Sequence, residues 1–526
     1  MKSEGLHRTA GDTLPHNWRD RAEIRLSTEP PGPAARRWID HHLRFAAPST
    51  YLYPFVWDVT APAEGPFCTD PDGNLFLDFY GHVGAAPLGY NHPEILRDCG
   101  VPFDPVKAAD HDTYLAAGPD PRRPAALPAP PASPARGGPA GFLTPGHLQE
   151  RLAGTVRPFG HDRVFLVNSG AEANENAFKI AVYRKHREVR SNLGEGGYRD
   201  LCRQLGIRPD PYLDGLYEDY PFFGLAAHGG FHGRTLGVLS ATHSRASLKE
   251  GFPALRWIRH FPFNAPRREM EALLARESLA FLLREERLAR TVFQERKIPR
   301  ELLAFLILEP VQGEGGYVFP EGNFPAEAAG FARAHGALFI ADEVQTGVGR
   351  TGRWWACERL GVVPDLLTAA KALRVGAVTG RREVFPRESG VLSSTWAGGA
   401  VASAVGARTL GVIEEEDLLG NAARTGTVLL RGLEDLASRH PAVTGVRALG
   451  LLAAVDLECG EARDALVRAA FRRGLLILGC GDRTIRLLPP LNVREREIKM
   501  GLRVLEAALT ETEGARPRPG AAVLAE

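Results

Sequence analysis

The 526-residue chain carries 64 lysine and arginine residues against 63 aspartate and glutamate residues, and 44% of its residues are apolar. This composition is that of an ordinary globular protein, long enough for two to four domains. The formal net charge of +1 argues against a nucleic acid or membrane partner that is recruited by charge.

Six cysteines are dispersed along the chain with no CxxC pair. We interpret them as reduced thiols, and we expect neither a disulfide framework nor a metal site. No apolar run approaches the roughly 20 residues that span a bilayer. The N-terminal MKSEGLHRTAGD has no apolar core and indicates no secretory signal. We therefore expect a cytoplasmic protein.

The N-terminal part predicts an extended arm, a helix and a hairpin. Residues 1–33 are polar and rich in proline, and RRWIDHHLRF follows with a helical pattern. Asp72-Gly73 stands between two short apolar runs, which favours a β-hairpin. Residues 118–140 are low-complexity Pro/Ala sequence that cannot bury much surface, and we assign them no chemistry.

Residues 147–189 predict a helix, a strand and a second helix. The turn Ser169-Gly170-Ala171 lies between this strand and this helix, where free backbone N–H groups form an anion site. A plain turn with a capping serine is the alternative. Residues 190–222, rich in charge and tyrosine, look like an insertion.

The sequence GLAAHGGFHGRTLGVLSATHS predicts a further strand, a glycine turn and a helix. Residues 268–301 combine a helical period with interleaved charge, and we expect outer helices with a solvated face. From about residue 405 the pattern is helix, short strands, helix and strands, which predicts a small α+β domain.

Three short apolar runs between Leu303 and Gly380 predict buried parallel strands. Polar residues follow each run, and ligands of open α/β sheets bind at the carboxyl ends of the strands. We expect these side chains to converge on one crevice: Glu309, Asp342, Gln345 and Lys371.

Lys371 differs in its setting from the other seven lysines, because it follows a strand-like run and precedes a loop of small residues. A lysine in an apolar setting has a lowered pKa and can form a Schiff base with a carbonyl. Asp342, one strand away, suits a pyridinium nitrogen. A structural ion pair of Lys371 with Glu309 or Asp342 is the alternative.

EPVQGEGG, DEVQTGVGRTG and the strand-borne AAK follow one another in this order, and SGAEANENAFK precedes them. In these motifs the chain resembles the class III (ω-amino acid) aminotransferases of pyridoxal-phosphate fold type I, over about residues 28–510. The resemblance implies a large α/β domain, residues 91–404, with a mostly parallel seven-stranded sheet flanked by helices. It also implies a small α+β domain from both termini, residues 1–90 and 405–515, and a tail at 516–526.

The resemblance implies pyridoxal 5′-phosphate as the cofactor, with Lys371 and Asp342 as catalytic residues. Phe231 and Val344 would lie on the two faces of the pyridine ring, and Gln345 would bind its 3′-oxygen. Core packing is the alternative for Phe231. The cofactor phosphate would be bound by Ser169, Gly170, Ala171 and, from the neighbouring subunit, Thr395. A Ser/Thr turn is the alternative for Thr395, whereas the phosphate role implies an obligate homodimer with shared sites.

For the substrates, the resemblance implies that Arg486 grips a carboxylate through paired hydrogen bonds. Glu314 would pair with Arg486 while an ω-amine is bound, and Arg234 would hold a distal carboxylate. A surface ion pair is the alternative for Arg234. Glu309 would hold the site residues in place without contacting the cofactor or the substrate itself.

The implied activity is transfer of an amino group from an ω-amino acid to 2-oxoglutarate. The short loop KALRVGAVTG, with Arg374 where glycine is usual, resembles the 4-aminobutyrate and L-lysine 6-aminotransferases. We favour 4-aminobutyrate over lysine or ornithine. An amino-acid racemase and a cofactor-binding protein without turnover are more distant alternatives. Ser169 and Glu172 stand where some relatives carry cysteines for an iron–sulfur cluster, so we expect no cluster.

Overall fold

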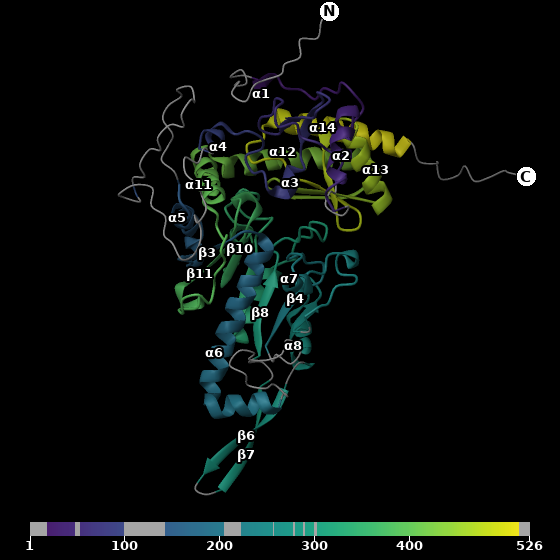
Figure 1. Ribbon diagram of the computed structural model, residues 1–526. Coiled ribbons are helices and arrows are strands. Elements are labelled where there is room, and N and C mark those ends of the chain that lie inside the picture. The colour runs from purple at the N-terminus through teal and green to yellow at the C-terminus, as the bar shows by residue number, and fades with distance from the viewer. Residues whose placement is uncertain are drawn as a thin grey trace, which may run out of the picture. The chain divides into compact units, whose positions relative to one another are not determined.

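The computed structural model (Figure 1) describes residues 18–47, 53–98, 122, 143–204, 222–255, 257–276, 279–287, 290–298 and 302–514. The chain divides into two units. We call residues 97–348 and 353–411 the large unit, and residues 1–96, 349–352 and 412–526 the terminal unit. The Pro/Ala segment, apart from Arg122, and the tail lie outside the described residues.

A seven-stranded sheet forms the centre of the large unit. Its spatial order is β3 (Arg163–Val167), β11 (Gly376–Gly380), β10 (Leu366–Ala369), β9 (Leu338–Asp342), β8 (Leu303–Leu308), β4 (Phe223–Ala227) and β5 (Ile258–Phe261). Only β11 runs antiparallel to its neighbours, and the other pairs are parallel. The predicted fold class, a large and mostly parallel sheet flanked by helices, is confirmed.

The apolar runs become the inner strands because they are covered on both faces. All six residues of β8 are buried. The rings of Phe305 on β8 and Phe178 stack with centroids 4.3 Å apart. Next to them the chain requires a glycine, because a Cβ on Gly224 would lie 2.2 Å from the Phe305 ring.

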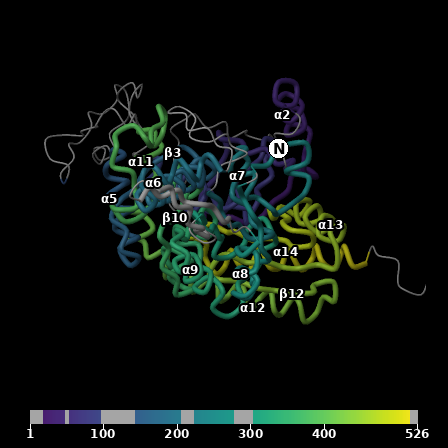
Figure 2. The backbone as a smooth tube through the Cα atoms, turned by 90° about the horizontal axis from the view of Figure 1, so that it is seen from below, coloured from purple at the N-terminus to yellow at the C-terminus, as the bar shows by residue number. Residues whose placement is uncertain are grey.

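Helices cover both faces of this sheet. In Figure 2, α6 (Gly170–Gln204) and α9 (Phe324–Ala334) lie on opposite sides of β10. The remaining helices and 3-10 turns of the large unit are α5 (Pro145–Thr155), η1 (Arg157–Phe159), α7 (Leu236–Ala241), η2 (Ala246–Leu248), α8 (Arg267–Arg276), α10 (Ala356–Arg359), η3 (Lys371–Leu373), η4 (Arg382–Val384) and α11 (Ala400–Glu415), whose last residues belong to the terminal unit.

The prediction of helices over residues 268–301 is wrong beyond Arg276. Helix α8 ends there, and β6 (Leu279–Arg287) pairs antiparallel with β7 (Arg290–Ile298) from Leu279↔Ile298 to Arg287↔Arg290. Short apolar and charged runs match helix and strand periods equally well, and the Thr-Val-Phe stretch of β7 favours a strand. Helix α6 also continues beyond the expected end, through a kink at Gly194.

The terminal unit joins the two ends of the chain. The predicted hairpin is confirmed, since β1 (Phe67–Thr69) pairs antiparallel with β2 (Leu75–Asp78). Strand β14 (Leu475–Leu476) then lies parallel to β2 in the same sheet. A second sheet has the order β12 (Val443–Leu449), β13 (Leu452–Leu457), β16 (Thr484–Leu487) and β15 (Leu478–Cys480).

A buried ion pair also ties the N-terminal segment to the C-terminal helix. Arg19 donates from Nε and Nη2 to the Glu497 carboxylate, at 2.8 Å each. The helices of this unit are α1 (Trp18–Arg21), α2 (Pro33–Leu43), α4 (Pro93–Asp98), whose last two residues belong to the large unit, α12 (Leu418–Arg439), α13 (Gly460–Phe471) and α14 (Glu495–Gly514). The segment labelled α3 (Gly81–Gly84) is instead a left-handed turn with four successive positive φ angles.

Among the described residues, no helix has the length and apolar character that a membrane crossing requires. The same residues contain no group of three or more histidine, cysteine or acidic side chains arranged to hold a metal ion.

Candidate active site

The polar residues that follow β8, β9 and β10 lie at one edge of the sheet, as their strand positions predicted. Glu309 comes directly after β8, Asp342 ends β9, and Lys371 comes two residues after β10. The Asp342 charge contributes to raising the pKa of Glu309. These three strands belong to the large unit, so the arrangement is defined within one part of the chain.

The Asp342 carboxylate is held by three donors. Oδ2 accepts a hydrogen bond from Asn174 Nδ2 at 2.8 Å and lies 2.8 Å from Nδ1 of His232. Oδ1 accepts from the Val344 backbone N–H at 3.1 Å. A carboxylate with one oxygen fixed in this way keeps lone pairs on the other, Oδ1, for a cationic nitrogen.

Asn174 is itself fixed at both ends of its amide. Its Nδ2 also donates to the His232 carbonyl at 2.8 Å, and its Oδ1 accepts from Thr368 Oγ1 at 2.7 Å. Thr368 lies on β10 opposite Asp342 on β9. The orientation of Asp342 is therefore set by α6, by β10 and by the loop after β4.

Glu309 holds two loops together. Its Oε1 accepts from the Phe231 backbone N–H and its Oε2 from the Gly313 backbone N–H, both at 2.9 Å. Burial, more than the neighbouring Asp342 charge, raises the pKa of Glu309 to about 7. Near neutral pH this carboxyl therefore titrates, although both oxygens serve backbone donors.

The first turn of α6 lies against the lysine loop. A Cβ on Gly170 would lie 2.9 Å from a Val344 methyl and 3.5 Å from Cβ of Ala370, the residue before Lys371. Ser169 caps this helix, because its Oγ accepts from the Glu172 backbone N–H at 3.2 Å. The Gly170 and Ala171 amides of the first turn have no intrahelical acceptor, and the helix dipole favours an anion beside them.

Lys371 occupies an unusual backbone conformation. Its φ of 48° lies in the left-handed region, which a residue with a side chain adopts only when its surroundings compel it. Arg374, three residues on, has a φ of 66°. Such conformations cluster where function requires a side chain to be aimed.

The loop after β4 carries Phe231 and Arg234 toward the same helix end. Gly233 in this loop lies so close to α6 that a Cβ would come within 2.8 Å of the Ala171 Cβ. Phe231 is half-buried and Arg234 is exposed. Gln345 lies on the opposite loop, where a Cβ on Gly313 would come within 2.8 Å of its Oε1.

Three further predicted residues lie on other segments. Glu314 follows Gly313 and is half-buried, and Thr395 is exposed in the segment before α11. Arg486 is buried on β16 in the terminal unit.

The sequence reasoning missed Asn174 and His232 as supports of Asp342. Both stand inside motifs that it quoted, EANENAFK and FHGRT. A signal was present in each: Asn174 lies one helical turn after Gly170, and His232 follows the expected ring-stacking residue.

The residues present fit pyridoxal phosphate. Gln345 is 9% exposed, and its Oε1 has no hydrogen-bond partner in the described part of the chain. Gln345 comes three residues after the anchored Asp342, and Val344 between them lies against Gly170 at the start of α6. A flat, anionic, pyridine-containing group would satisfy these polar groups together.

The chain is similar to known proteins over most of its length. The sequence profile of "Aminotransferase class-III" matches residues 141–509. The mitochondrial 4-aminobutyrate aminotransferase of Sus scrofa is 30% identical over 495 residues, which cover 92% of this chain and 91% of the relative. The L-lysine-epsilon aminotransferase of Amycolatopsis lactamdurans is 32% identical over 496 residues, covering 93% and 98%.

Among solved structures, the lysine aminotransferase of M. tuberculosis superposes with a TM-score of 0.67 at 27% identity, covering 91% of this chain and all of the other. Fold and site together define a pyridoxal-phosphate enzyme of fold type I. The chain belongs to the class III aminotransferases, and it is a transaminase with pyridoxal 5′-phosphate as its cofactor.

Proposed function

We propose that the protein transfers the amino group of an ω-amino acid, with 4-aminobutyrate as the first candidate, to 2-oxoglutarate. The products are the corresponding semialdehyde and glutamate. Support for a donor of this kind comes from relatives named as 4-aminobutyrate and L-lysine-epsilon aminotransferases, which align over nearly the whole chain.

The observation that carries the proposal is the position of Arg234. This exposed arginine stands on a loop whose two preceding anchors, Phe231 and His232, are bound to Glu309 and Asp342. The guanidinium is thus carried on a loop fixed to the site, and it is always charged. A donor with a carboxylate at the end remote from its amine matches that arrangement.

Each residue of the site then has a specific role in the amino transfer. The bound cofactor supplies an electron sink for the carbon that loses a proton. Nζ of Lys371 is the base that takes this proton and later returns one. Asp342 would keep the ring nitrogen protonated, and Val344 and Phe231 would hold the ring from its two faces.

The two substrates place different demands on the arginines. We propose that Arg234 binds the distal carboxylate of 4-aminobutyrate, and of glutamate in the second half-reaction. Arg486 binds the carboxylate of the keto acid, and Glu314 pairs with Arg486 while the ω-amine donor is present. Such a pair lets one site accept substrates with one or two carboxylates.

A shared dimeric site is part of the same proposal. Thr395 is exposed, and its neighbour Trp396 is 64% exposed, among the large apolar side chains that stand out from the surface. Tryptophan is enriched at protein interfaces, so this position suits a subunit contact. The partner subunit's cofactor phosphate would accept from the Thr395 hydroxyl and amide.

The decisive experiment is a visible absorbance scan of the purified holoenzyme during sequential substrate addition. The cofactor band should change with 4-aminobutyrate and return with 2-oxoglutarate, with stoichiometric formation of glutamate. A response to lysine or ornithine alone would transfer the proposal to that donor. Loss of substrate chirality without glutamate formation would show a racemase and overturn it.

Arg234→Ala provides the test of the donor site. It should raise KM for 4-aminobutyrate by about ten- to a hundredfold, because a charge-assisted contact contributes roughly 1.5–3 kcal/mol. Cofactor affinity should stay unchanged. Arg276→Ala, an exposed arginine at the end of α8, is the matched control. An equal loss of donor and cofactor binding would make Arg234 a structural residue.

A further inference from the structure

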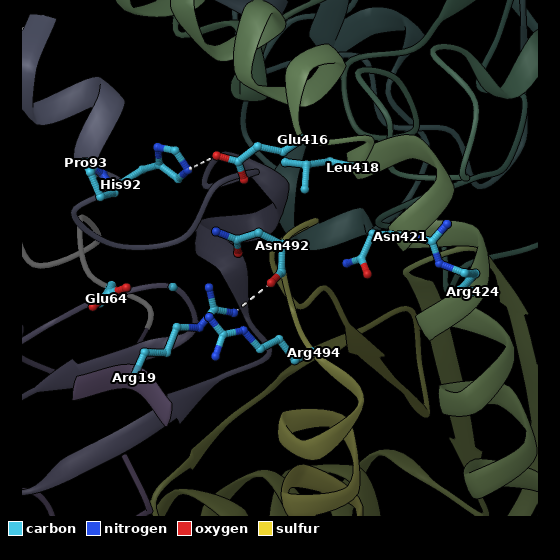
Figure 3. A pocket seen from close by; sticks show the side chains of 11 residues that line it. Arg19, Glu64, His92, Pro93, Glu416, Leu418, Asn421, Arg424, Asn492 and Arg494 are labelled. Atoms are coloured by element: carbon cyan, nitrogen blue, oxygen red, sulfur yellow. Dashed lines mark hydrogen bonds and ion pairs between the residues drawn. The ribbon is translucent and has the colours of Figure 1, made fainter. Parts of the chain in front are cut away.

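Basic side chains that gather in the terminal unit are accompanied by carboxylates. A pocket of about 320 Å³ in this unit is lined by one histidine and three arginines, among other residues. Figure 3 shows the His92 ring directed at the Glu416 carboxylate, with Nε2 and Oε1 3.2 Å apart. Each arginine also has an acidic partner: Arg19 has Glu497, Arg424 has Asp417 and Arg494 has Asp20.

Three histidines of the large unit gather without such a partner. We call His228, His243 and His260 the histidine cluster. The ring centroids of His228 and His243 lie 4.5 Å apart, those of His243 and His260 5.0 Å, and those of His228 and His260 6.1 Å. In the part of the chain that the structure describes, no carboxylate pairs with these rings. Nε2 of His260 instead donates to the Ala241 carbonyl at 3.4 Å.

The charges that act on the cluster are positive. Burial, the His228 ring and the Lys249 ammonium lower the pKa of His243. Burial, Lys249 and the other two histidines lower the pKa of His260 from an ordinary value of 6.5 to about 4. A second proton on the cluster would place two like charges on rings that are in contact, and such charges repel each other.

The surrounding sequence offers little to offset these charges. By element, the titratable groups are His228 at the end of β4, His243 after α7, Lys249 after η2 and His260 on β5. The stretch from His243 to His260 contains one acidic residue, Glu250, which is exposed. It also contains four basic residues: Arg245, Lys249, Arg256 and Arg259.

Two members of the cluster stand at the ends of residues 228–243, the segment that carries Phe231 and Arg234. The His228 N–H donates to the Phe261 carbonyl at 2.7 Å, and the His243 N–H donates to the Gly230 carbonyl at 2.6 Å. The third member, His260, lies on β5, which pairs with β4 directly before this segment. The base of the cofactor loop is therefore closed where the three rings meet.

We propose that the histidine cluster is a pH-sensitive switch, which holds residues 228–243 closed while its rings are neutral and lets them open when it takes up protons in mildly acidic solution. Opening loosens the loop that carries Phe231 and weakens cofactor binding. The inference does not depend on which amine donor the enzyme uses.

The direction of the pH effect follows from the lowered pKa values of His243 and His260. Above pH 6.5 these rings are neutral in the closed and the open segment alike. Between pH 6.5 and about 4, the open segment takes up protons first, because its histidines have an ordinary pKa. A fall in pH through this window therefore favours the open segment.

Hydrogen exchange of the holoenzyme at about pH 7.5 and about pH 5 tests the proposal, after correction for the intrinsic exchange rate of amides. Amides of residues 228–243 should lose protection about tenfold or more at the lower pH. Those of β8, which is buried throughout, should keep theirs. Unchanged protection in residues 228–243 would overturn the proposal. An equal loss in β8 would do so too, because it would show general unfolding.

Variants then identify the groups that take up the protons. His260→Gln removes a titrating ring but keeps a donor for the Ala241 carbonyl, and it should retain protection near pH 5. Lys249→Gln should reduce the loss, because protons on the cluster no longer face this ammonium. His41→Gln and Lys179→Gln, two exposed control positions on α2 and α6, should lose protection as the parent does.

A loss of protection in His260→Gln that equals the parent's would contradict the assignment. If circular dichroism shows that His260→Gln does not fold, Lys249→Gln decides, and a loss equal to the parent's there would overturn the proposal.

Cofactor release provides a second measurement. Between about pH 7.5 and about pH 5, the Kd of pyridoxal phosphate, measured by dilution of the holoenzyme, should rise about tenfold more in the parent than in His260→Gln. Comparison of the two proteins removes the titration of the cofactor itself, which both share. An equal rise in both would show that the cluster does not act on the cofactor loop, and it would overturn the proposal.

Discussion

Nδ1 of His232 lies 2.8 Å from Oδ2 of Asp342, and both side chains are buried. This contact joins the end of β9 to the loop that carries Phe231. Since Asn174 donates to the same oxygen, Asp342 cannot rotate without breaking two hydrogen bonds. The orientation of the Asp342 carboxylate is therefore set by side chains of the protein itself.

Asn174→Ala should lower kcat by about ten- to a hundredfold and weaken cofactor binding. The substitution removes a hydrogen bond to the Asp342 carboxylate and leaves Thr368 Oγ1 without its acceptor. Steady-state kinetics at saturating cofactor and a cofactor titration measure the two effects. Asn176→Ala, on the same helix, removes only a bond to the Glu172 carbonyl and is the control. Similar losses in both variants would mean that helix stability, not Asp342, is affected.

Lys371→Ala should abolish transamination, because Lys371 is the side chain that we propose as the base for proton transfer. The expected drop in activity is at least about 10⁴-fold. The visible band of the bound cofactor should shift to that of unattached pyridoxal phosphate, while circular dichroism stays unchanged. Lys179→Ala, an exposed lysine on α6, should retain parental activity and absorbance. Persistence of the parental band in the Lys371 variant would show that another lysine holds the cofactor.

Glu309 should make the stability of the cofactor-free protein depend on pH. Its pKa is raised from an ordinary value of 4.5 to about 7, first by burial. Below pH 4.5 the carboxyl is protonated in the folded and unfolded chains alike. As pH rises to 7 the unfolded chain loses this proton first, so the free energy of unfolding should fall by on the order of 3 kcal/mol.

Chemical denaturation between pH 4.5 and 8 tests this expectation. Glu309→Gln should lack that slope, whereas Glu327→Gln, on the exposed side of α9, should keep it. A parallel pH dependence in the Glu309 variant and the parent would assign the slope to other groups.

Mixed dimers should show whether sites are shared. Chains with Lys371→Ala should be nearly inactive, and chains with Thr395→Ala should bind cofactor about tenfold or more weakly. If Thr395 serves the partner's site, a mixed dimer contains one site with both Lys371 and Thr395 intact. Co-expression of the two variants should then restore activity at limiting cofactor. No restoration would place Thr395 in the same subunit's site.

The fold and the strand-end residues were accessible from sequence because local patterns specify them. The runs before Glu309, Asp342 and Lys371 are apolar throughout, and parallel strands bring such residues to a common edge. The hairpin at Asp72-Gly73 could also be predicted from sequence, because two adjacent residues specify its turn.

What sequence could not provide depends on contacts between distant segments. Asn174 and Asp342 are 168 positions apart. Neither the helix pattern around Asn174 nor the strand pattern before Asp342 predicts their hydrogen bond. The left-handed φ of Lys371 likewise arises from its surroundings, because lysine has no preference for that conformation. The sequence of residues 279–298 matches both a helix period and a strand period. These residues form strands because the two segments pair with each other.

The terminal unit brings residues 1–96 together with residues 412–526. Strand β2 needs β14 beside it, and buried Arg19 needs Glu497. During translation, about 300 residues separate the emergence of the two parts, or roughly 15 to 60 s at ordinary ribosome speeds. For that interval the nascent N-terminal segment exposes apolar strands without their neighbour. We therefore expect chaperones to bind the first hundred residues while the rest of the chain is synthesised.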